Sequence, residues 1–362
     1  MNIALIEPFY GGSHKQWVDG LMSNSQHRYS LLSLDAKNWK WRMYGGAISL
    51  AKEFEQLHEE IDLILASDML DLALFMALCK NRASHCKTAL YFHENQMTYP
   101  WTSLDKEKKT NRDRHYAFIN YTSALCADKI FFNSAFHKTS FLQAAKDFLQ
   151  VLPKPQELDS IDTIAAKSEV LYIGLDLPEI VRDHNESPPL KIAWNHRWEE
   201  DKNPGAFRDL LESLSDENFS FELILLGDRN ECNPFLKEIE MDFASHIIYN
   251  AYASTKEDYY KQLSRADILP VTSHHDFFGI SIVEAIQVGV HPLLPFDLSY
   301  PELIPEAIYP AVFYKDATDL KKRILEFTRE KARQNAMKKH IEKFKWSNLI
   351  RKYDQTLLKI IR

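Results

Sequence analysis

The sequence predicts an α/β protein with two domains, each built around a doubly wound parallel sheet, and three observations support this class. The chain has 362 residues, more than one hydrophobic core usually holds, so two domains are expected. Short runs that are apolar on both faces alternate with helical patterns along the chain, as strands covered by helices on both sides do. The polar stretch VRDHNESPPL (181–190) interrupts this alternation, and its two prolines indicate a linker.

The predicted strands fall on both sides of that linker. Those of the first half are NIALIE (2–7), YSLLSL (29–34), DLILAS (62–67), TALYFH (88–93), KIFFNS (129–134) and VLYIG (170–174). Those of the second half are LKIAWN (190–195), FELILLG (221–227), HIIYN (246–250), ADILPV (266–271) and VHPLLP (290–295). Because such alternation forms βαβ units, we predict Rossmann-like domains over 1–182 and 188–340 and a final amphipathic helix over 341–362.

The composition argues against several classes of protein. A net charge of −7 does not indicate a generally basic nucleic-acid binder, although it leaves room for a local basic patch. The four cysteines (Cys79, Cys86, Cys126 and Cys232) form no CxxC pair and no metal-binding spacing, which predicts free thiols in a reducing cytosol. The first residues lack the pattern of a signal peptide, and no apolar run is long enough to span a membrane. We therefore expect a cytoplasmic protein without membrane contact.

The strongest candidate site is the segment SHHDFFGISIVEAIQVG (273–289), which follows a predicted strand. Open parallel sheets bind ligands at the carboxyl ends of their strands, so residues in this position come first. A helix should begin near Ile280 and end at Gly289. The N–H groups of Phe278, Gly279 and Ile280 would then form an anion site that the helix dipole supports.

Two carboxylates belong to the same segment. Asp276 precedes the predicted helix and Glu284 lies about one turn inside it, so the two could face different parts of one ligand. A sugar nucleotide has a suitable shape, with a sugar at one end and a ribose with two hydroxyls beyond a diphosphate. Glu284 would accept hydrogen bonds from the ribose. The alternative is a carboxylate that caps the helix and a solvated glutamate.

A second candidate is WNHRWEEDKNPGAF (194–207), where a strand ends and a helix begins after Asn203–Pro204. Asn195, Arg197 and Lys202 lie in the connecting loop. Two cations at the carboxyl end of a strand suit a diphosphate and the charge that develops on it as a leaving group. The alternative is a pair of surface cations beside three acidic neighbours.

The third candidate, YFHENQMTYPW (91–101), follows a strand of the first domain. His93 could donate a hydrogen bond to a sugar hydroxyl or exchange a proton. Glu94, with the neighbouring Asn95 and Gln96, could orient an acceptor. The alternative for His93 is a histidine with a purely structural role.

Two further segments lie nearer the N-terminus. EPFYGGSHKQ (7–16) does not match the dinucleotide-binding GxGxxG pattern, but Gly11 and Gly12 would let a ligand approach the backbone; a simple turn is the alternative. DAKNWKWRMYGGA (35–47) combines aromatic and basic residues, as a surface that stacks bases and contacts phosphates does, and an amphipathic cover over the sheet is the alternative. Its candidates for acceptor binding are Lys37, Trp39, Lys40, Trp41 and Arg42.

The second half of the chain resembles the retaining GT-B glycosyltransferases of the glycosyltransferase-4 type. Their Glu–x7–Glu element has a counterpart in Asp276 and Glu284, with Phe277 where Gly is usual, and their basic pair matches Arg197 and Lys202. FKWSNLIRKY (344–353) is similar to the closing helix of that family. The resemblance implies a GT-B fold of two Rossmann-like domains that face each other across a cleft, with the C-terminal helix crossing back to the N-terminal domain.

A narrower resemblance rests on three N-terminal segments. EPFYGGSHKQW, NWKWRMYGGA and FHENQMTYP together are similar to the tRNA-queuosine mannosyltransferase family. That resemblance implies transfer of mannose from GDP-mannose to queuosine in tRNA-Asp, with retention of configuration. No Asp-x-Asp motif occurs, so we expect no metal and no cofactor besides the nucleotide sugar. The alternatives are a transferase acting on a small molecule or glycan, and a nucleotide-sugar binding protein or epimerase that transfers nothing.

Overall fold

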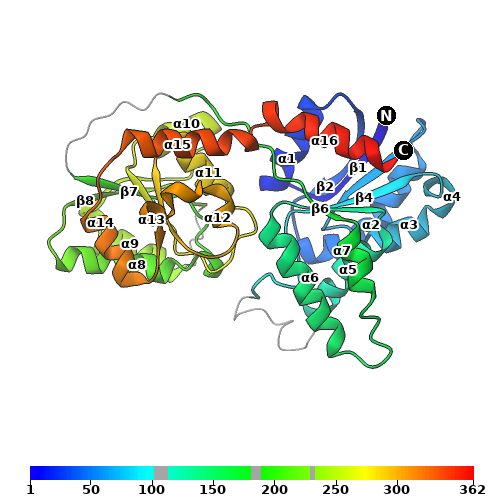
Figure 1. The fold of residues 1–362 in the computed structure, drawn as a ribbon, viewed down its shortest axis with the longest axis horizontal. Coiled ribbons are helices and arrows are strands. Elements are labelled where there is room, and N and C mark those ends of the chain that lie inside the picture. The colour runs from blue at the N-terminus through cyan, green and yellow to red at the C-terminus, as the bar shows by residue number, and fades with distance from the viewer. Residues whose placement is uncertain (102–112, 181–188, 229–232) are drawn as a thin grey trace. The chain divides into compact units, whose positions relative to one another are not determined.

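The computed structural model describes residues 1–101, 113–180, 189–228 and 233–362. The chain divides into two compact units, of which unit 1 comprises Met1–Asp176 with Phe344–Arg362 and unit 2 comprises Leu177–Lys343 (Figure 1). Cys232, most of the predicted linker and most of the basic stretch KEKKTNRDR (106–114), which could contact phosphates, lie outside the described residues. Within the described residues, no helix combines the length and the apolar character needed to cross a membrane.

Unit 1 is built on a six-stranded parallel sheet in the order β2-β1-β3-β4-β5-β6. Its strands are β1 (Asn2–Tyr10), β2 (Arg28–Asp35), β3 (Leu63–Ser67), β4 (Lys87–Phe92), β5 (Lys129–Phe132) and β6 (Ser168–Val170). All six predicted strands of the first half are present, but the strand predicted over 170–174 is wrong beyond Val170. The chain leaves the sheet there because Leu175 pairs instead with Lys345, in a short parallel bridge near the C-terminus.

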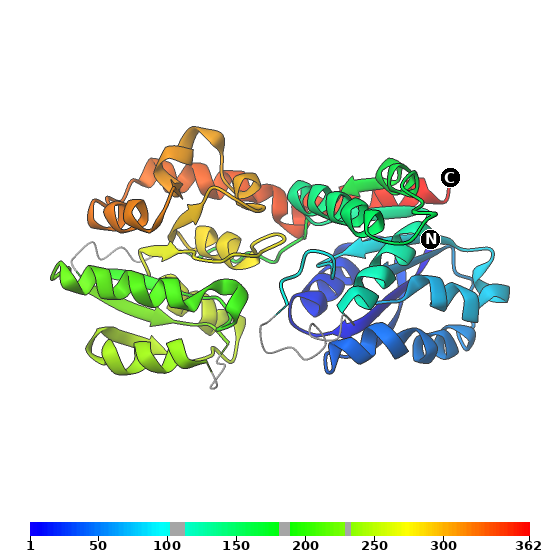
Figure 2. The same cartoon turned by 90° about the horizontal axis from the view of Figure 1, so that it is seen from below.

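Helices cover both faces of this sheet (Figure 2). On one face, α1 (Gly12–Asn24) packs against the C-terminal helix α16 (Trp346–Ile360). The helices of the other face contact one another in series, and they are α2 (Trp39–Glu55), α3 (Leu72–Leu78), α5 (Asp113–Cys126), α7 (Ser160–Ala166) and α6 (Ala135–Gln150). A short α4 (Lys80–Ala83) follows α3. The main core lies between the sheet and this second layer.

Aromatic side chains fix α16 to unit 1. The indole N–H of Trp17 donates to the Tyr353 hydroxyl at 3.0 Å, and that hydroxyl donates to the carbonyl of Tyr172 at 2.8 Å. Trp346 is buried between Gly20 and Gly174, where a Cβ added to either glycine would come within 2.3 Å of the indole. Only glycine leaves room for the ring on both sides, so the C-terminal helix is part of the core of unit 1.

Unit 2 contains a second six-stranded parallel sheet in the order β12-β11-β10-β7-β8-β9. Its strands are β7 (Leu190–Trp194), β8 (Phe221–Leu225), β9 (Ile247–Asn250), β10 (Ile268–Pro270), β11 (His291–Pro295) and β12 (Phe313–Tyr314). The five strands predicted for this half are confirmed. The two-residue β12 was not predicted because it is too short to show a periodic pattern.

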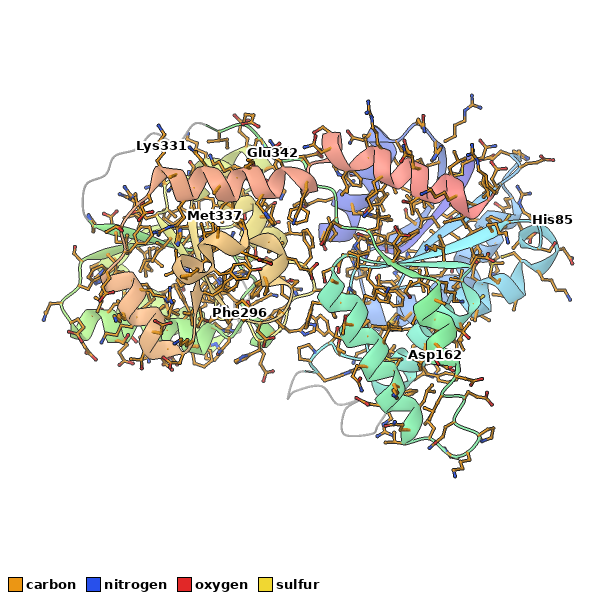
Figure 3. All side chains as sticks on the ribbon, in the orientation of Figure 1. His85, Asp162, Phe296, Lys331, Met337 and Glu342 are labelled. Atoms are coloured by element: carbon orange, nitrogen blue, oxygen red, sulfur yellow. The ribbon has the colours of Figure 1, made fainter. Side chains whose placement is uncertain are left out.

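Helices also cover both faces of the second sheet (Figure 1). One layer consists of α8 (Pro204–Asp216), α9 (Pro234–Asp242) and α14 (Ala317–Leu325), and the other of α10 (Lys256–Leu263), α11 (Ile280–Gln287) and α15 (Lys331–Ile341). The short helices α12 (Tyr300–Leu303) and α13 (Tyr309–Val312) and the 3-10 turns η2 (Glu200–Lys202), η3 (Ala244–His246), η4 (Glu306–Ile308) and η5 (Glu342–Phe344) connect them. Figure 3 labels Met337 on α15, whose buried side chain belongs to the layer that packs on α11.

Removing the Trp346 side chain should destabilise unit 1. Trp346→Ala leaves a cavity between Gly20 and Gly174, and large-to-small changes of buried aromatic residues cost about 3–5 kcal/mol. Urea unfolding followed by amide exchange in unit 1 would measure the loss. Trp41→Ala is the matched control because 63% of Trp41 is exposed, and it should cost less than about 1 kcal/mol. Equal losses in the two variants would contradict the role given to Trp346.

Candidate functional site

Each unit gathers polar side chains at the carboxyl ends of its central strands. In unit 2 the cluster begins where β10 leads into α11. Gly279 precedes the first turn of α11 with a φ of +95°, a conformation that favours glycine. A Cβ there would also come within 3.0 Å of Leu303, so both backbone and packing require glycine. The helix predicted from Ile280 is confirmed, and Gly289 follows its end with a φ of +83°.

Lys202 lies between two carboxylates of this cluster. Its Nζ is 3.2 Å from Asp201 Oδ2 and 3.6 Å from Asp276 Oδ2, and it donates to the carbonyl of His275 at 2.9 Å. Burial raises the pKa of Asp276, but the Lys202 ammonium, His196 and the Phe278 N–H outweigh that effect and leave the pKa below its ordinary value. Lys202 therefore acts first as the charge partner of the buried Asp201 and the partly buried Asp276.

Glu284 is buried and holds three hydrogen bonds. It accepts from Lys256 Nζ at 2.5 Å, from the Tyr259 hydroxyl at 2.9 Å and from the Tyr260 hydroxyl at 3.3 Å. Asn195 extends the network by donating to the Tyr259 hydroxyl at 3.0 Å. The alternative of a solvated glutamate is therefore wrong: α11 points Glu284 into a preformed polar network.

Arg197 and His196 differ sharply in exposure although they are neighbours. Half of the Arg197 side chain is exposed, and its Nη1 lies 3.1 Å from Glu199 Oε2. His196 is buried, with Nδ1 3.1 Å from Ser281 Oγ. Burial and the Lys202 charge lower the pKa of His196 to about 4, so this ring is neutral at physiological pH. The two predicted cations thus differ, since Lys202 is nearly buried and Arg197 is accessible.

In unit 1 the cluster surrounds His93, at the end of β4. The His93 N–H donates to Asp68 Oδ1 at 2.7 Å, and the His93 carbonyl accepts from Asn133 Nδ2 at 2.8 Å. Its ring is buried beside Trp17 and Tyr91, and neither ring nitrogen has a hydrogen-bond partner among the described residues. Burial, and then the charges of two other histidines, lower the pKa of His93 well below 6.5.

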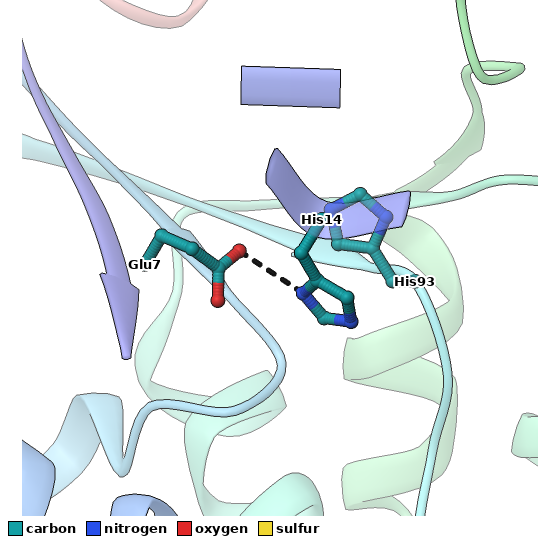
Figure 4. Close-up of side chains that lie close together, drawn as sticks. All are labelled: Glu7, His14 and His93. Carbon is teal, nitrogen blue, oxygen red and sulfur yellow. Dashed lines mark hydrogen bonds and ion pairs between the residues drawn. The ribbon is translucent and has the colours of Figure 1, made fainter. Parts of the chain in front are cut away.

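Glu7 and His14 form a buried pair next to that ring (Figure 4). The Nδ1–H of His14 donates to Glu7 Oε2 at 3.1 Å, and the other Glu7 oxygen accepts from Ser67 Oγ at 3.0 Å and the Phe9 N–H at 2.9 Å. Burial lowers the pKa of His14, but the charge and hydrogen bond of Glu7 outweigh it and raise the pKa to about 9. His14 is therefore a buried imidazolium at neutral pH.

Sequence reasoning missed Glu7 and His14 as functional residues, although both lie in the quoted segment 7–16. The strand predicted over 2–7 ends at Glu7. A carboxylate inside an otherwise apolar buried run was the available signal, because such a group needs a partner. Lys256 and Tyr259 were missed as well, since nothing in the local sequence ties α10 to Glu284.

The predicted acceptor residues after β4 hold the local loop. Asn95 Oδ1 accepts from the N–H groups of Met97 and Thr98 at 3.0 and 2.9 Å, which fixes a turn. The Gln96 N–H donates to Asn120 Oδ1 at 2.7 Å, and the Gln96 side chain donates to Glu94 Oε1 at 3.0 Å. The segment is therefore ordered by its own side chains.

The glycine pair joins β1 directly to α1. Gly12 is the first residue of α1, with a φ of +54°, and a Cβ there would meet no atom within 4 Å. Gly11 has extended backbone, but a Cβ would lie 2.3 Å from that of Ala36. Packing thus explains Gly11, whereas Gly12 leaves the backbone open to approach at the start of a helix.

The predicted basic and aromatic segment separates into buried and exposed parts. Trp39 packs against Tyr116 and Trp101, with ring centroids 5.2 and 6.1 Å apart, and Lys40 Nζ lies 5.1 Å from the Trp101 ring. Trp41 is exposed. Of the remaining candidates, Lys37 is exposed and Arg42 donates to the carbonyl of Asp35 at 3.0 Å. Trp39 is therefore packed inside unit 1 and Trp41 faces solvent, and binding of an acceptor by this segment stays a prediction.

Glu7, His14 and His93 also offer one oxygen and two nitrogen atoms that lie within 4.8 Å of one another, a spacing that a metal ion could bridge. His14 Nδ1 and Glu7 Oε2 are already hydrogen-bonded to each other at 3.1 Å. The other Glu7 oxygen accepts from two further donors. The geometry thus fits a hydrogen-bonded ion pair more closely than a ligand set.

Comparison with known families covers almost the whole chain. A family described as "tRNA-queuosine alpha-mannosyltransferase N-terminal" matches residues 2–175, and one described as "Glycosyl transferases group 1" matches residues 178–344. A tRNA-queuosine alpha-mannosyltransferase of Drosophila melanogaster is 32% identical over 341 residues, which cover 91% of this chain and 87% of that protein.

Solved structures share the fold at low sequence identity. Sucrose-phosphate synthase of Thermosynechococcus elongatus gives a TM-score of 0.71 at 12% identity, covering 99% of both chains. HepE of Anabaena, solved in complex with UDP, gives 0.68 at 16% identity, covering 99% of this chain and 100% of that one. The N-terminal domain of Candida albicans trehalose-6-phosphate phosphatase gives 0.71 at 12% identity, with 99% and 97% covered. The two parallel sheets with their helices therefore form a GT-B fold, as predicted.

The buried pair in unit 1 should make stability depend on pH. The folded-state pKa of His14, about 9, exceeds its ordinary value of 6.5. Its contribution is therefore complete below pH 6.5 and is lost as the pH rises through about 9, by at most about 3 kcal/mol. Urea unfolding of the wild-type chain across this window, followed by amide exchange of β1 and β4, should show the fall. His14→Gln should flatten the profile, and an unchanged slope would contradict the ion pair.

Proposed function

This chain is a glycosyltransferase that belongs to the tRNA-queuosine alpha-mannosyltransferase family, and we propose that it transfers a mannosyl group to the queuosine nucleoside of a tRNA. The observation that carries the proposal is the 32% identity to a protein of that name over 91% of this chain. The family and enzyme class predicted from the sequence are confirmed by the same relationship. The donor GDP-mannose and the acceptor tRNA-Asp are the finer parts of the proposal.

The cluster of unit 2 has the groups that a nucleotide-sugar donor requires. The N-terminus of α11 offers a favourable dipole and the N–H groups of Gly279 and Ile280 to the diphosphate, whereas the Phe278 N–H, also predicted for this role, donates to Asp276 at 3.4 Å. Glu284, held by Lys256 and two tyrosines, is oriented to accept from ribose hydroxyls with little further ordering. A neighbour in fold, HepE, was solved with UDP, which supports a nucleotide diphosphate as the ligand of this fold.

The two cations would contribute at different stages. Half of the Arg197 side chain is exposed, and its ion pair with Glu199 is a solvent-exposed one that a diphosphate could replace at small cost. Lys202 is already neutralised by Asp201 and Asp276. When Asp276 binds the hydroxyls of the sugar, Lys202 is released to face the leaving phosphate. Charge stabilisation of the leaving group is the main catalytic contribution of this unit.

The cluster of unit 1 would serve the sugar and the acceptor. Both nitrogens of the His93 ring are buried and lack a hydrogen-bond partner among the described residues, so a sugar hydroxyl that reaches the ring would supply one, and the open backbone at Gly12, next to Gly11, would lie close to the donor. Glu94, Asn95 and Gln96 would line the acceptor side. We expect same-face displacement with retention of configuration and without a metal ion.

The tRNA would bind the segment 35–47, which contains the start of α2. Trp41 offers an exposed ring for stacking on a base, and Lys37, Lys40 and Arg42 supply positive charge on a chain whose net charge is −7. Recognition would then be local, through unpaired bases and a few phosphates, rather than through a wide basic surface.

Transfer can be tested directly. The purified chain is incubated with GDP-mannose and tRNA-Asp that carries queuosine, and the nucleoside is examined for a mass gain of one hexose. The same tRNA with guanosine in place of queuosine is the control, and UDP- and ADP-sugars test the donor. Modification of free queuosine or of a glycan in preference to the tRNA would overturn the acceptor part of the proposal. Donor hydrolysis without any transfer would overturn the proposal as a whole.

The two cations should be separable by mutation. Arg197→Ala should lower kcat by about 100- to 1000-fold, because one lost contact to developing charge costs about 2.7–4 kcal/mol, while stability changes little. Lys202→Ala should lower activity and also destabilise unit 2 by about 3–5 kcal/mol, because Asp201 and Asp276 lose their partner. Steady-state kinetics and thermal unfolding measure both. Wild-type-like turnover in both variants would refute the phosphate role.

Replacing Trp41 should weaken the binding of tRNA without changing the binding of the sugar donor. Trp41→Ala should raise the KM for tRNA by about 5- to 150-fold, because stacking on one base is worth about 1–3 kcal/mol. The KM for GDP-mannose should stay within about twofold. Phe296→Ala in unit 2 is the matched control, since both side chains are 63% exposed. A KM for tRNA that changes equally in the two variants would exclude Trp41 from the acceptor surface.

A further inference from the structure

The Glu7 carboxylate is buried near the end of β1 and accepts hydrogen bonds from three donors. It is fully buried, Ser67 Oγ and the Phe9 N–H both donate to Oε1, and His14 donates to Oε2. The register of β1 against β2 shifts between Glu7 and Tyr10, and Pro8, which has no N–H, lies in this irregularity. The backbone thus turns one N–H away from the sheet and toward the carboxylate.

This anchoring fixes the charge of His14. Burying an unpaired carboxylate is costly, and among the ion pairs of the described residues Glu7 has only His14 as a partner. His14 therefore satisfies Glu7 best when both of its nitrogens are protonated. Its second nitrogen lies on the side of the ring away from Glu7 (Figure 4).

His93 lies directly against this charge. The ring centroids of His14 and His93 are 4.2 Å apart, with an interplanar angle of 40°. Trp17 and Tyr91 enclose the His93 ring on other sides, each with a centroid 4.8 Å away. No hydrogen bond of a described residue reaches either His93 nitrogen. A second positive charge on His93 would thus meet a like charge in an apolar setting.

We propose that Glu7 holds His14 as a fixed positive charge whose function is to keep the adjacent His93 ring neutral, so that His93 can exchange a hydrogen bond with a substrate hydroxyl in both directions. A neutral imidazole has one donor and one acceptor nitrogen, whereas an imidazolium only donates. The inference rests on the proposed function where it assigns that hydroxyl to the sugar donor or to queuosine. Glu7 and His14 are positioning residues in this scheme, and His93 is the residue that contacts substrate.

The charged groups around the pair support the assignment. Asp68 and Glu94, which follow β3 and β4, add to the attraction that Glu7 exerts on the His14 proton. His137, on α6, adds to the repulsion that disfavours a proton on His93. Acidic groups therefore favour protonation of His14, whereas burial first, and then the charges of His14 and His137, disfavour protonation of His93. His14 and His93 therefore differ in protonation because His14, and not His93, is hydrogen-bonded to the Glu7 carboxylate in the described structure.

The first test needs no substrate. The full-length chain is labelled with carbon-13 at the histidine Cε1 positions. His14→Gln and His93→Gln assign two signals, and NMR follows both from well above pH 9 down past pH 6.5. In the wild type we expect His14 to titrate near pH 9 and His93 to remain neutral well below pH 6.5. In Glu7→Gln, which keeps the volume and an acceptor oxygen, the His14 titration should fall to pH 6.5 or below, and that of His93 should rise.

The second test uses the reaction with GDP-mannose and queuosine tRNA. In Glu7→Gln and His14→Gln, the acid limb of kcat/KM against pH should move to higher pH, with activity recovering as the pH is raised. Structural damage alone would lower the whole profile. Asp19→Asn is the matched control, because it removes a carboxylate that pairs with Lys15 at 2.5 Å on the surface of the same helix, and its profile should stay unchanged.

Three results would overturn the inference. The first is a wild-type His14 that titrates at its ordinary pKa of 6.5, and the second is an acid limb that is the same in Glu7→Gln as in the wild type. The third is one zinc ion per wild-type chain that is absent from both variants, since the cluster would then be a metal site. If the wild-type chain transfers no sugar, the proposed function fails, while the NMR result still decides the charge states of His14 and His93.

Discussion

Burying a carboxylate is expensive unless hydrogen bonds and an opposite charge replace the water it loses, and each unit of this chain is organised around one such group. In unit 1 the group is Glu7, which Ser67, the Phe9 N–H and His14 surround. In unit 2 it is Glu284, which Lys256 and two tyrosines surround. Both lie near the carboxyl ends of parallel strands, where the sheet supplies a rigid base. The two carboxylates are therefore already oriented before a substrate binds. This lowers the entropy cost of ordering side chains during binding.

The two networks use that rigidity differently. Around Glu284 the partners are phenolic and amine donors, so the carboxylate stays an acceptor with a fixed direction. Around Glu7 the partner is a histidine ring that passes its charge state on to a second ring, 4.2 Å away. Lys202 and Asp276 form a third arrangement, in which a cation and an anion neutralise each other, and we propose that a bound donor separates them. A glycosyltransferase needs all three properties: direction, a defined protonation state, and charge that becomes available only when the donor is bound.

The sequence predicted the sheets well because strands buried on both faces leave continuous apolar runs, such as those of β3 and β8. It also predicted correctly which candidate residues follow the ends of strands, because this depends only on their positions next to each strand in the sequence. It failed where a partner is distant in the chain or a segment is short. Lys256 lies 28 residues from Glu284, and β12 has only two residues. The role of Glu7 was not predicted for a different reason. A charged residue after an apolar run indicates the end of a strand, and Glu7 follows such a run.

The position of α16 has a consequence for how the protein is made. Unit 1 contains both the first 176 residues and the last 19, from Phe344 to Arg362. A ribosome must therefore synthesise all of unit 2 before Trp346 can enter its place between Gly20 and Gly174. Until then the nascent N-terminal half exposes the apolar surface that α16 covers, including the side of Trp17 that bonds Tyr353. Domains usually fold in order of synthesis, but here the second unit can finish first, and chaperones would meet the unclosed first unit during that interval.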